Sequence, residues 1–121
     1  MDSPVGDAAA LRFLVDPACP WSWRTSRWVI DVRRHEPITV RWEVFSLEYA
    51  NRNAPDNPSL EQMPRMRPAR RLLELARRVG GDDAIGRLYA ALGEARHERG
   101  EDLAGSAVLA GSMRRGSTRV A

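Results

Sequence analysis

Residues 11–23 read LRFLVDPACPWSW, and this stretch decides which fold the chain can adopt. Its first five residues are mostly apolar, as in a buried β-strand, and the Asp-Pro pair that follows stops the strand. A helix is predicted to begin near Cys19 or Pro20, because proline is tolerated in a first helical turn, where its missing N–H would have no partner. Four residues at helical spacing are expected to form one packed stripe along this helix: Trp21, Thr25, Trp28 and Val32.

A second strand is predicted at residues 38–45, ITVRWEVF, because apolar and polar residues alternate there. One apolar face and one polar face indicate a strand near the edge of a sheet. Strand, helix and strand within about 35 residues form a βαβ unit, in which parallel pairing and a right-handed crossover are strongly preferred.

The rest of the chain is predicted to be loop and helix. Residues 51–59, NRNAPDNPS, have the composition of a loop, and residues 69–79 form a helix that stops at the Gly80-Gly81 pair. Asp82 is expected to cap a second helix that runs from Asp83 to about Arg99 and ends at Gly100. The buried face of that helix is expected to be Ile85, Leu88, Tyr89 and Leu92.

Composition excludes several classes of protein. The chain has 121 residues, 43% of them hydrophobic and 29% charged, which is typical of one globular domain. No apolar run approaches the roughly 20 residues of a membrane helix. Asp2 and Asp7 replace the basic start of a secretory signal, so a cytoplasmic location is expected. The net charge of +3 is too small to indicate nucleic-acid binding by itself.

Cys19 is the one cysteine of the chain, so it is either a buried apolar residue or a free thiol. At the start of a helix the unpaired N–H groups and the helix dipole favour a thiolate, the reactive form of cysteine. The spacing is that of a Cys-x-x-Cys redox motif with Ser22 in the last position. Ser22 can offer both its N–H and its hydroxyl to the sulfur.

Residues 13–32, FLVDPACPWSWRTSRWVIDV, resemble the active-site segment of the DsbA-like branch of the thioredoxin superfamily. Within that branch they are most similar to the actinobacterial mycothiol-dependent oxidoreductases of the nitroreductase type. Members carry Asp-Pro-x-Cys-Pro-Trp-Cys-Trp and then Thr-Ser-Arg-Trp, and this chain differs at Ser22, where the family has a resolving cysteine. The similarity continues through VRWEVFSLEYANRN and LYAALGEARHERGEDL, and covers residues 11–103.

The resemblance implies an α/β, thioredoxin-like fold of the DsbA type with a helical insertion after the second strand. The family fold closes with a cis-proline loop, two strands and a helix, and no segment after Asp102 resembles them. We therefore expect the C-terminal half of the fold to be absent or supplied by a second chain. The expected divisions are a flexible N-terminal arm at 1–10, a βαβ unit at 11–50, the helical insertion at 51–103 and a poorly ordered tail at 104–121.

The resemblance also implies a thiol–disulfide oxidoreductase. Because a dithiol route needs a second cysteine, a single sulfur predicts a monothiol route, with Cys19 as nucleophile and Ser22 as hydrogen-bond donor. Mycothiol, or glutathione, is the expected thiol cosubstrate, with no tightly bound cofactor and with disulfides or electrophiles as substrates. The residues expected to bind the cosubstrate are Pro20, Trp21, Trp23 and His97, the two tryptophans as an apolar wall.

Several alternatives remain open at this stage. The chain could be a catalytically inactive thioredoxin-like binding module or a remnant. It could have a transferase or isomerase activity, since glutathione-handling relatives place a serine near this turn. Cys19 could pair with His97 for hydrolysis, although nothing orients that histidine. Trp28 is expected in the core, and Trp21 either there or against a ligand. One cysteine and two histidines predict no metal site. A last alternative is a nucleic-acid patch of arginines: Arg65, Arg67, Arg70, Arg71, Arg77, Arg78, Arg114 and Arg115.

Overall fold

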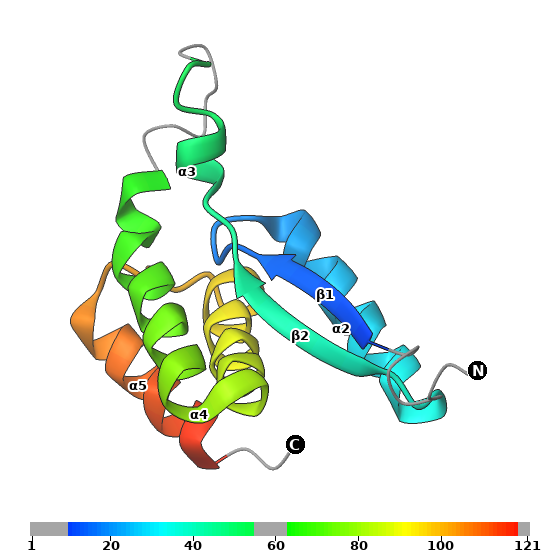
Figure 1. Ribbon diagram of the computed structural model, residues 1–121. Helices are drawn as coiled ribbons and strands as arrows, with labels where there is room; N and C mark the ends of the chain where they lie inside the picture. The colour runs from blue at the N-terminus through cyan, green and yellow to red at the C-terminus, as the bar shows by residue number, and fades with distance from the viewer. Residues whose placement is uncertain (1–9, 55–62, 119–121) are drawn as a thin grey trace.

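The computed structural model of the protein describes residues 10–54 and 63–118. Two strands, β1 (Ala10–Val15) and β2 (Thr39–Val44), are joined by helix α2 (Pro20–His35). The strands are parallel, and their register runs from Ala10 opposite Thr39 to Val15 opposite Val44. The predicted parallel βαβ unit is confirmed, and Figure 1 shows α2 behind the two strands.

The two faces of the sheet differ as the alternation in β2 predicts. One face is apolar, with Val40 and Trp42 each 2% exposed and the Phe13 ring packed edge-on to Trp42. The other face carries an ion pair between Arg12 and Glu43. On the outer edge of β2, the Trp42 N–H donates to the carboxylate of Asp82 at 3.0 Å. Asp82, which we expected to cap a helix, thus provides a partner for a strand-edge donor.

The buried face of α2 is not the predicted one. Its buried residues are Trp23, Ser26 and Val29, whereas Trp21 is 69% exposed and Trp28 is 66% exposed. The predicted stripe is therefore wrong, and Trp28 lies outside the core. The reason lies on another element, because Gly93 has no side chain and leaves room for the ring of Trp23.

A set of helices follows β2. They are α3 (Leu47–Ala50), the 3-10 turn η1 (Met63–Met66), α4 (Arg67–Gly93) and the π-helical turn η2 (Glu94–Glu98). Helix α4 is interrupted at Gly81, whose φ is 70°, so the predicted break between two helices is confirmed. The predicted buried face of the second half is also confirmed, since its four residues are at most 6% exposed. Residues 55–59 of the predicted loop lie outside the described residues.

Helix α5 (Ser106–Thr118) forms where we expected a poorly ordered tail, and that expectation is wrong for this segment. The helix packs on α4, as Figure 1 shows. Its buried residues are small, namely Gly111, Ser112 and Gly116. Because these residues are small, the spacing of large apolar side chains in the sequence does not indicate this buried face. Of the predicted N-terminal arm, Ala10 belongs to β1, and residues 1–9 lie outside the described residues.

We expect Gly93→Ala to destabilise the fold. A Cβ on Gly93 would lie 2.1 Å from ring carbon Cε3 of Trp23, which is a buried ring, so the ring or the helix would have to shift. Overpacking of this kind costs about 3 kcal/mol of unfolding free energy. The matched control is Gly111→Ala on α5, whose added Cβ would be 3.5 Å from the flexible end of Arg115. Urea unfolding should show the control unchanged or up to about 1 kcal/mol more stable. Equal stability of both variants would contradict this packing.

Candidate functional site

Cys19 lies at the N-terminus of α2, as predicted, and is the residue that caps the helix. Its backbone is extended, and Pro20 occupies the first helical position. The Cys19 Sγ accepts a hydrogen bond from the Ser22 N–H at 3.3 Å, and the residue is half-buried. The sulfur therefore takes the place that a capping oxygen usually takes at the positive end of a helix.

Asp16 determines the turn that precedes Cys19, and the sequence reasoning missed it. The residue is 1% exposed, and its Oδ1 accepts the Ala18 N–H at 2.8 Å. Its Oδ2 accepts the Leu47 N–H at 2.7 Å, which joins the end of β1 to the segment after β2. In the sequence, the sign of this role is that Asp16 directly follows an apolar strand. From the sequence we expected the Asp-Pro pair only to stop the strand.

Arg70 of α4 supplies the positive charge for this buried carboxylate. The Arg70 Nη1 lies 3.5 Å from Asp16 Oδ2, and its Nη2 donates to Glu48 Oε1 at 2.7 Å. Hydrogen bonding from Arg67 lowers the pKa of Glu48 below its usual value, with help from the charge of Arg70. These hydrogen bonds and ion pairs connect α3 and α4 to the turn that carries the thiol.

The hydroxyl of Ser22 turns away from the sulfur toward Tyr89. The two hydroxyl oxygens are 2.6 Å apart, and Tyr89 is 0% exposed. Burial raises the pKa of Tyr89 to about 12, so its phenol keeps the proton near neutral pH. Of the two Ser22 groups that we expected to reach the sulfur, only the N–H does so.

Trp23 is part of the core and cannot form the expected apolar wall for a ligand. It is 6% exposed, and its ring stacks on His97 with centroids 6.0 Å apart. The guanidinium of Arg27 covers the ring at 4.2 Å. Of the other predicted ligand-binding residues, Pro20 and Trp21 are exposed beside the thiol, and His97 is half-buried.

His97 comes close to the thiol turn in space, although it lies 80 residues from Pro17 in the sequence. Its Nε2 is 3.1 Å from the Pro17 carbonyl oxygen. Burial lowers the pKa of His97, and the charge of Arg96 adds to this effect. Among the described residues no hydrogen bond joins His97 to Cys19, so the geometry gives no support to a Cys-His hydrolytic pair.

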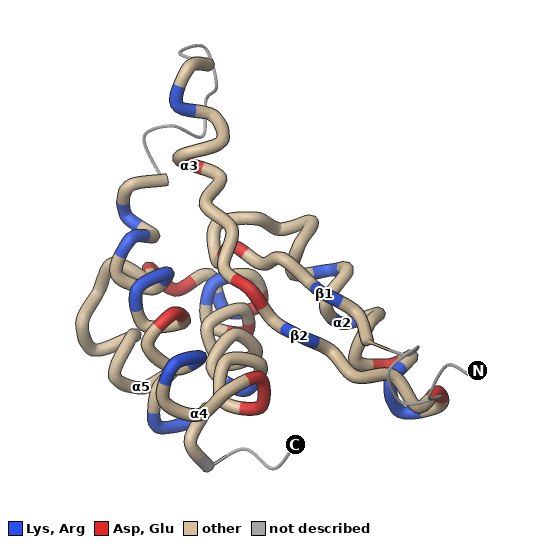
Figure 2. The backbone as a smooth tube through the Cα atoms, viewed as in Figure 1, with Lys and Arg blue, Asp and Glu red and all other residues tan. Residues whose placement is uncertain are grey.

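Four of the eight arginines of the proposed nucleic-acid patch form ion pairs with acidic side chains. Arg65 pairs with Asp102, Arg67 and Arg70 pair with Glu48, and Arg77 lies 4.0 Å from Glu74. Figure 2 shows acidic positions interspersed with basic ones along α4. Interspersed charge of this kind is typical of a solvated helix face and does not form a continuous basic surface along α4.

Within 10–54 and 63–118, no group of three or more His, Cys, Asp or Glu side chains comes together as a candidate metal site. In the same part of the chain, no helix combines the length and apolar character needed to cross a bilayer.

Comparison with known families adds to this geometry. The model of a family described as mycothiol-dependent nitroreductase Rv2466c matches residues 18–116, from the residue before Cys19 to the last turns of α5. The chain belongs to this family. The match passes residue 103, where we expected the resemblance to end, so most of α5 lies within this Rv2466c-like family region. The oxidoreductase character of the family supports the expected class of reaction.

A curated relative shares a shorter segment with this Rv2466c-like chain. It is the uncharacterized protein Rv2286c of Mycobacterium tuberculosis (strain ATCC 25618 / H37Rv), which is 49% identical over 39 residues. That segment is 32% of this chain and spans 17% of the length of the relative.

We expect Ser22→Ala to preserve the reactivity of Cys19 while lowering stability. The Ser22 N–H contacts the sulfur and the hydroxyl does not, so the alkylation rate of Cys19 by iodoacetamide should stay within about twofold. The buried Tyr89 hydroxyl would lose its partner, which costs about 1–3 kcal/mol of unfolding free energy. In the double variant with Tyr89→Phe, part of that loss should be recovered. A large fall in the alkylation rate of Ser22→Ala would show that the hydroxyl acts on the sulfur.

We expect stability to fall with pH on the acidic side of neutrality because of His97. Its folded-state pKa is lowered, so the unfolded chain takes up the proton first, and the stability falls once the pH drops below about 6.5. Urea unfolding at several pH values measures this dependence. His97→Gln should flatten the curve between pH ~7 and ~5, whereas His35→Gln, at the exposed end of α2, serves as the control. An unchanged slope in His97→Gln would contradict the assignment.

Proposed function

We propose that the chain is a thiol–disulfide oxidoreductase that reacts through Cys19 and uses mycothiol as its small-molecule thiol. The observation that carries the proposal is the position of the sulfur at the N-terminus of α2, 3.3 Å from the Ser22 nitrogen. Membership of a family described as mycothiol-dependent supports the choice of thiol. The reaction class then follows from what one thiolate can do.

The Cys19 sulfur lies at the positive end of the α2 dipole, beside the first N–H groups of the helix. The first turn of α2 contains no acidic residue, so no carboxylate there competes for the positive end of the helix. The Ser22 N–H points at the sulfur, and Pro20 adds no donor of its own. A thiolate held by backbone donors is the form that attacks disulfides.

The proposed reaction has two exchange steps. In the first, the Cys19 thiolate attacks a mixed disulfide between a protein and mycothiol, forms a disulfide with the mycothiol sulfur and releases the protein thiolate, which takes a proton from solvent. In the second, the thiolate of a free mycothiol attacks the mycothiol sulfur of the Cys19–mycothiol disulfide. This step forms the mycothiol disulfide and frees the Cys19 thiolate. The protein sulfur of the mixed disulfide is reduced to a thiol, and one free mycothiol is oxidised, forming a disulfide with the mycothiol that the substrate carried.

A monothiol route follows from the sequence, because position 22 is serine and Cys19 is the one cysteine of the chain. An external thiol must therefore supply the second sulfur of each cycle. In this route Ser22 contributes its N–H, and the exposed ring of Trp21 offers an apolar surface beside the reacting sulfur. His97 positions the turn through the Pro17 carbonyl.

We expect the purified chain to reduce a peptide–mycothiol mixed disulfide when free mycothiol is supplied, and Cys19→Ser to lose this activity entirely. Ser22→Ala is the matched control and should retain the activity within about threefold, because its backbone N–H is unchanged. The readout is peptide thiol released, followed by mass spectrometry, with glutathione and its peptide disulfide as a parallel pair.

Two outcomes would contradict the proposal. Activity retained in Cys19→Ser would remove Cys19 from the mechanism. A stable Cys19–mycothiol disulfide that free mycothiol does not resolve would indicate instead a binding module without turnover. Faster reaction with glutathione would replace mycothiol as the cosubstrate while leaving the role of the sulfur intact.

A further inference from the structure

A pocket of about 480 Å³ lies between α2, β2 and the second half of α4. Its volume is within the range of about 300–1,000 Å³ that small-molecule sites occupy. None of its lining residues belongs to the stretch from Cys19 to Trp23, so it is distinct from the thiol site. We call it the arginine pocket, and its lining residues are Arg27, Ile30, Arg33, Arg34, Trp42, Asp82, Asp83, Gly86, Arg87 and Ala90.

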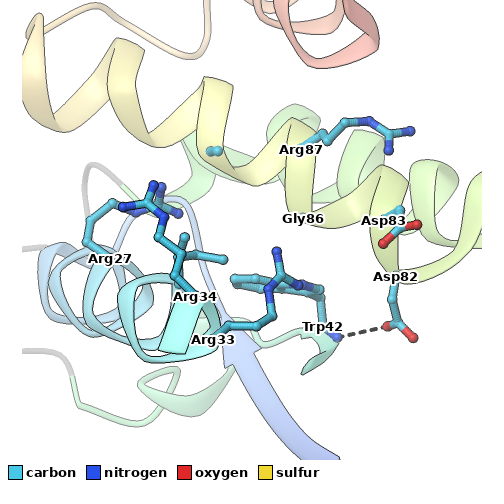
Figure 3. Close-up of a pocket in the computed structure, with 10 residues that line it drawn as sticks. Arg27, Arg33, Arg34, Trp42, Asp82, Asp83, Gly86 and Arg87 are labelled. Atoms are coloured by element: carbon cyan, nitrogen blue, oxygen red, sulfur yellow. Dashed lines mark hydrogen bonds between the residues drawn. The ribbon is translucent and has the colours of Figure 1, made fainter. Parts of the chain in front are cut away.

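The lining of the arginine pocket has an excess of positive charge. The lining includes four arginines and two aspartates, and Figure 3 shows three of the arginines on α2 and the fourth on α4. One of the aspartates, Asp82, already accepts the Trp42 backbone N–H. Arg34 has only a loose pair with Asp31 at 3.8 Å, and both side chains are more than 60% exposed. In the described part of the chain, Arg33 and Arg87 form no ion pair.

The floor of the pocket adds an apolar surface and one more donor. Ile30, Trp42 and Ala90 line it. Gly86 lies against the Trp42 indole, and a Cβ there would be 2.9 Å from Nε1. Among residues 10–54 and 63–118, no group accepts a hydrogen bond from this indole N–H. Hydrogen-bond donors thus outnumber acceptors around a partly apolar floor.

We propose that the arginine pocket binds a small molecule that carries a doubly charged oxyanion, such as a phosphate monoester, on a compact apolar body. Guanidinium groups form paired hydrogen bonds with phosphate and carboxylate oxygens, which is the chemistry that this lining offers. The apolar floor suits the body of the ligand. The proposal does not depend on the reaction proposed for Cys19, because the two sites share no residue.

The test is a titration of the full-length, ¹⁵N-labelled chain with inorganic phosphate at constant ionic strength, read from the indole N–H resonance of Trp42. We expect a saturable shift with a dissociation constant of about 1 mM or tighter. The double variant Arg33→Gln/Arg34→Gln should bind at least about tenfold more weakly. A parallel titration with malonate distinguishes the two sources of oxyanion, since a phosphate site prefers phosphate and a dicarboxylate site prefers malonate.

The matched control is Arg24→Gln/Arg41→Gln, which removes the same charge at two exposed arginines outside the pocket. Its binding should stay within about twofold of the unmodified chain, because neither of these side chains lines the pocket. Thermal unfolding of both double variants tests whether they fold. If the Arg33→Gln/Arg34→Gln variant does not fold, the single variants Arg33→Gln and Arg34→Gln replace it. Absence of a saturable Trp42 shift with either anion, or equal weakening in both double variants, would overturn the proposal.

Discussion

The buried carboxylate of Asp16 joins three segments that are far apart in the sequence. It accepts N–H groups from Ala18 and Leu47, and Arg70 of α4 supplies the opposite charge. A carboxylate at 1% exposure is costly unless donors and a positive charge surround it. These partners meet only when β1, α3 and α4 are all in place. The turn that presents Cys19 therefore depends on the arrangement of the whole domain.

At the thiol site, the group that contacts the sulfur and the side chains that position the turn are different. The described contact to the Cys19 sulfur comes from a backbone N–H, whereas the side chains around it hold the turn in place. Ser22 connects the turn to Tyr89, and His97 connects it to η2. The helical region after β2 thus has a direct structural relation to the thiol, which the sequence spacing of 67 and 80 residues does not reveal.

Local patterns predicted the βαβ unit, the break at Gly81 and the buried face of the second half of α4, because each depends on periodicity or backbone freedom. The same reasoning failed where contacts with residues far away in the sequence determine which side chains are buried. Gly93 makes Trp23 the buried tryptophan of α2, and small residues form the buried face of α5. For the thiol site, the place of Cys19 at the helix start followed from Pro20, but the roles of Asp16 and Tyr89 depend on partners that only the tertiary structure brings together.

Ser22 links the first turn of α2 to α4 through its side chain. Its hydroxyl satisfies the buried phenol of Tyr89, and a thiol is only a weak hydrogen-bond partner. With a cysteine at position 22, the Tyr89 hydroxyl would have only a weak hydrogen bond there, although Tyr89 is 0% exposed. The backbone N–H that faces Cys19 would be the same with either residue. The Ser22 hydroxyl therefore adds a bond to α4, while the N–H contact to the Cys19 sulfur does not depend on the side chain at this position.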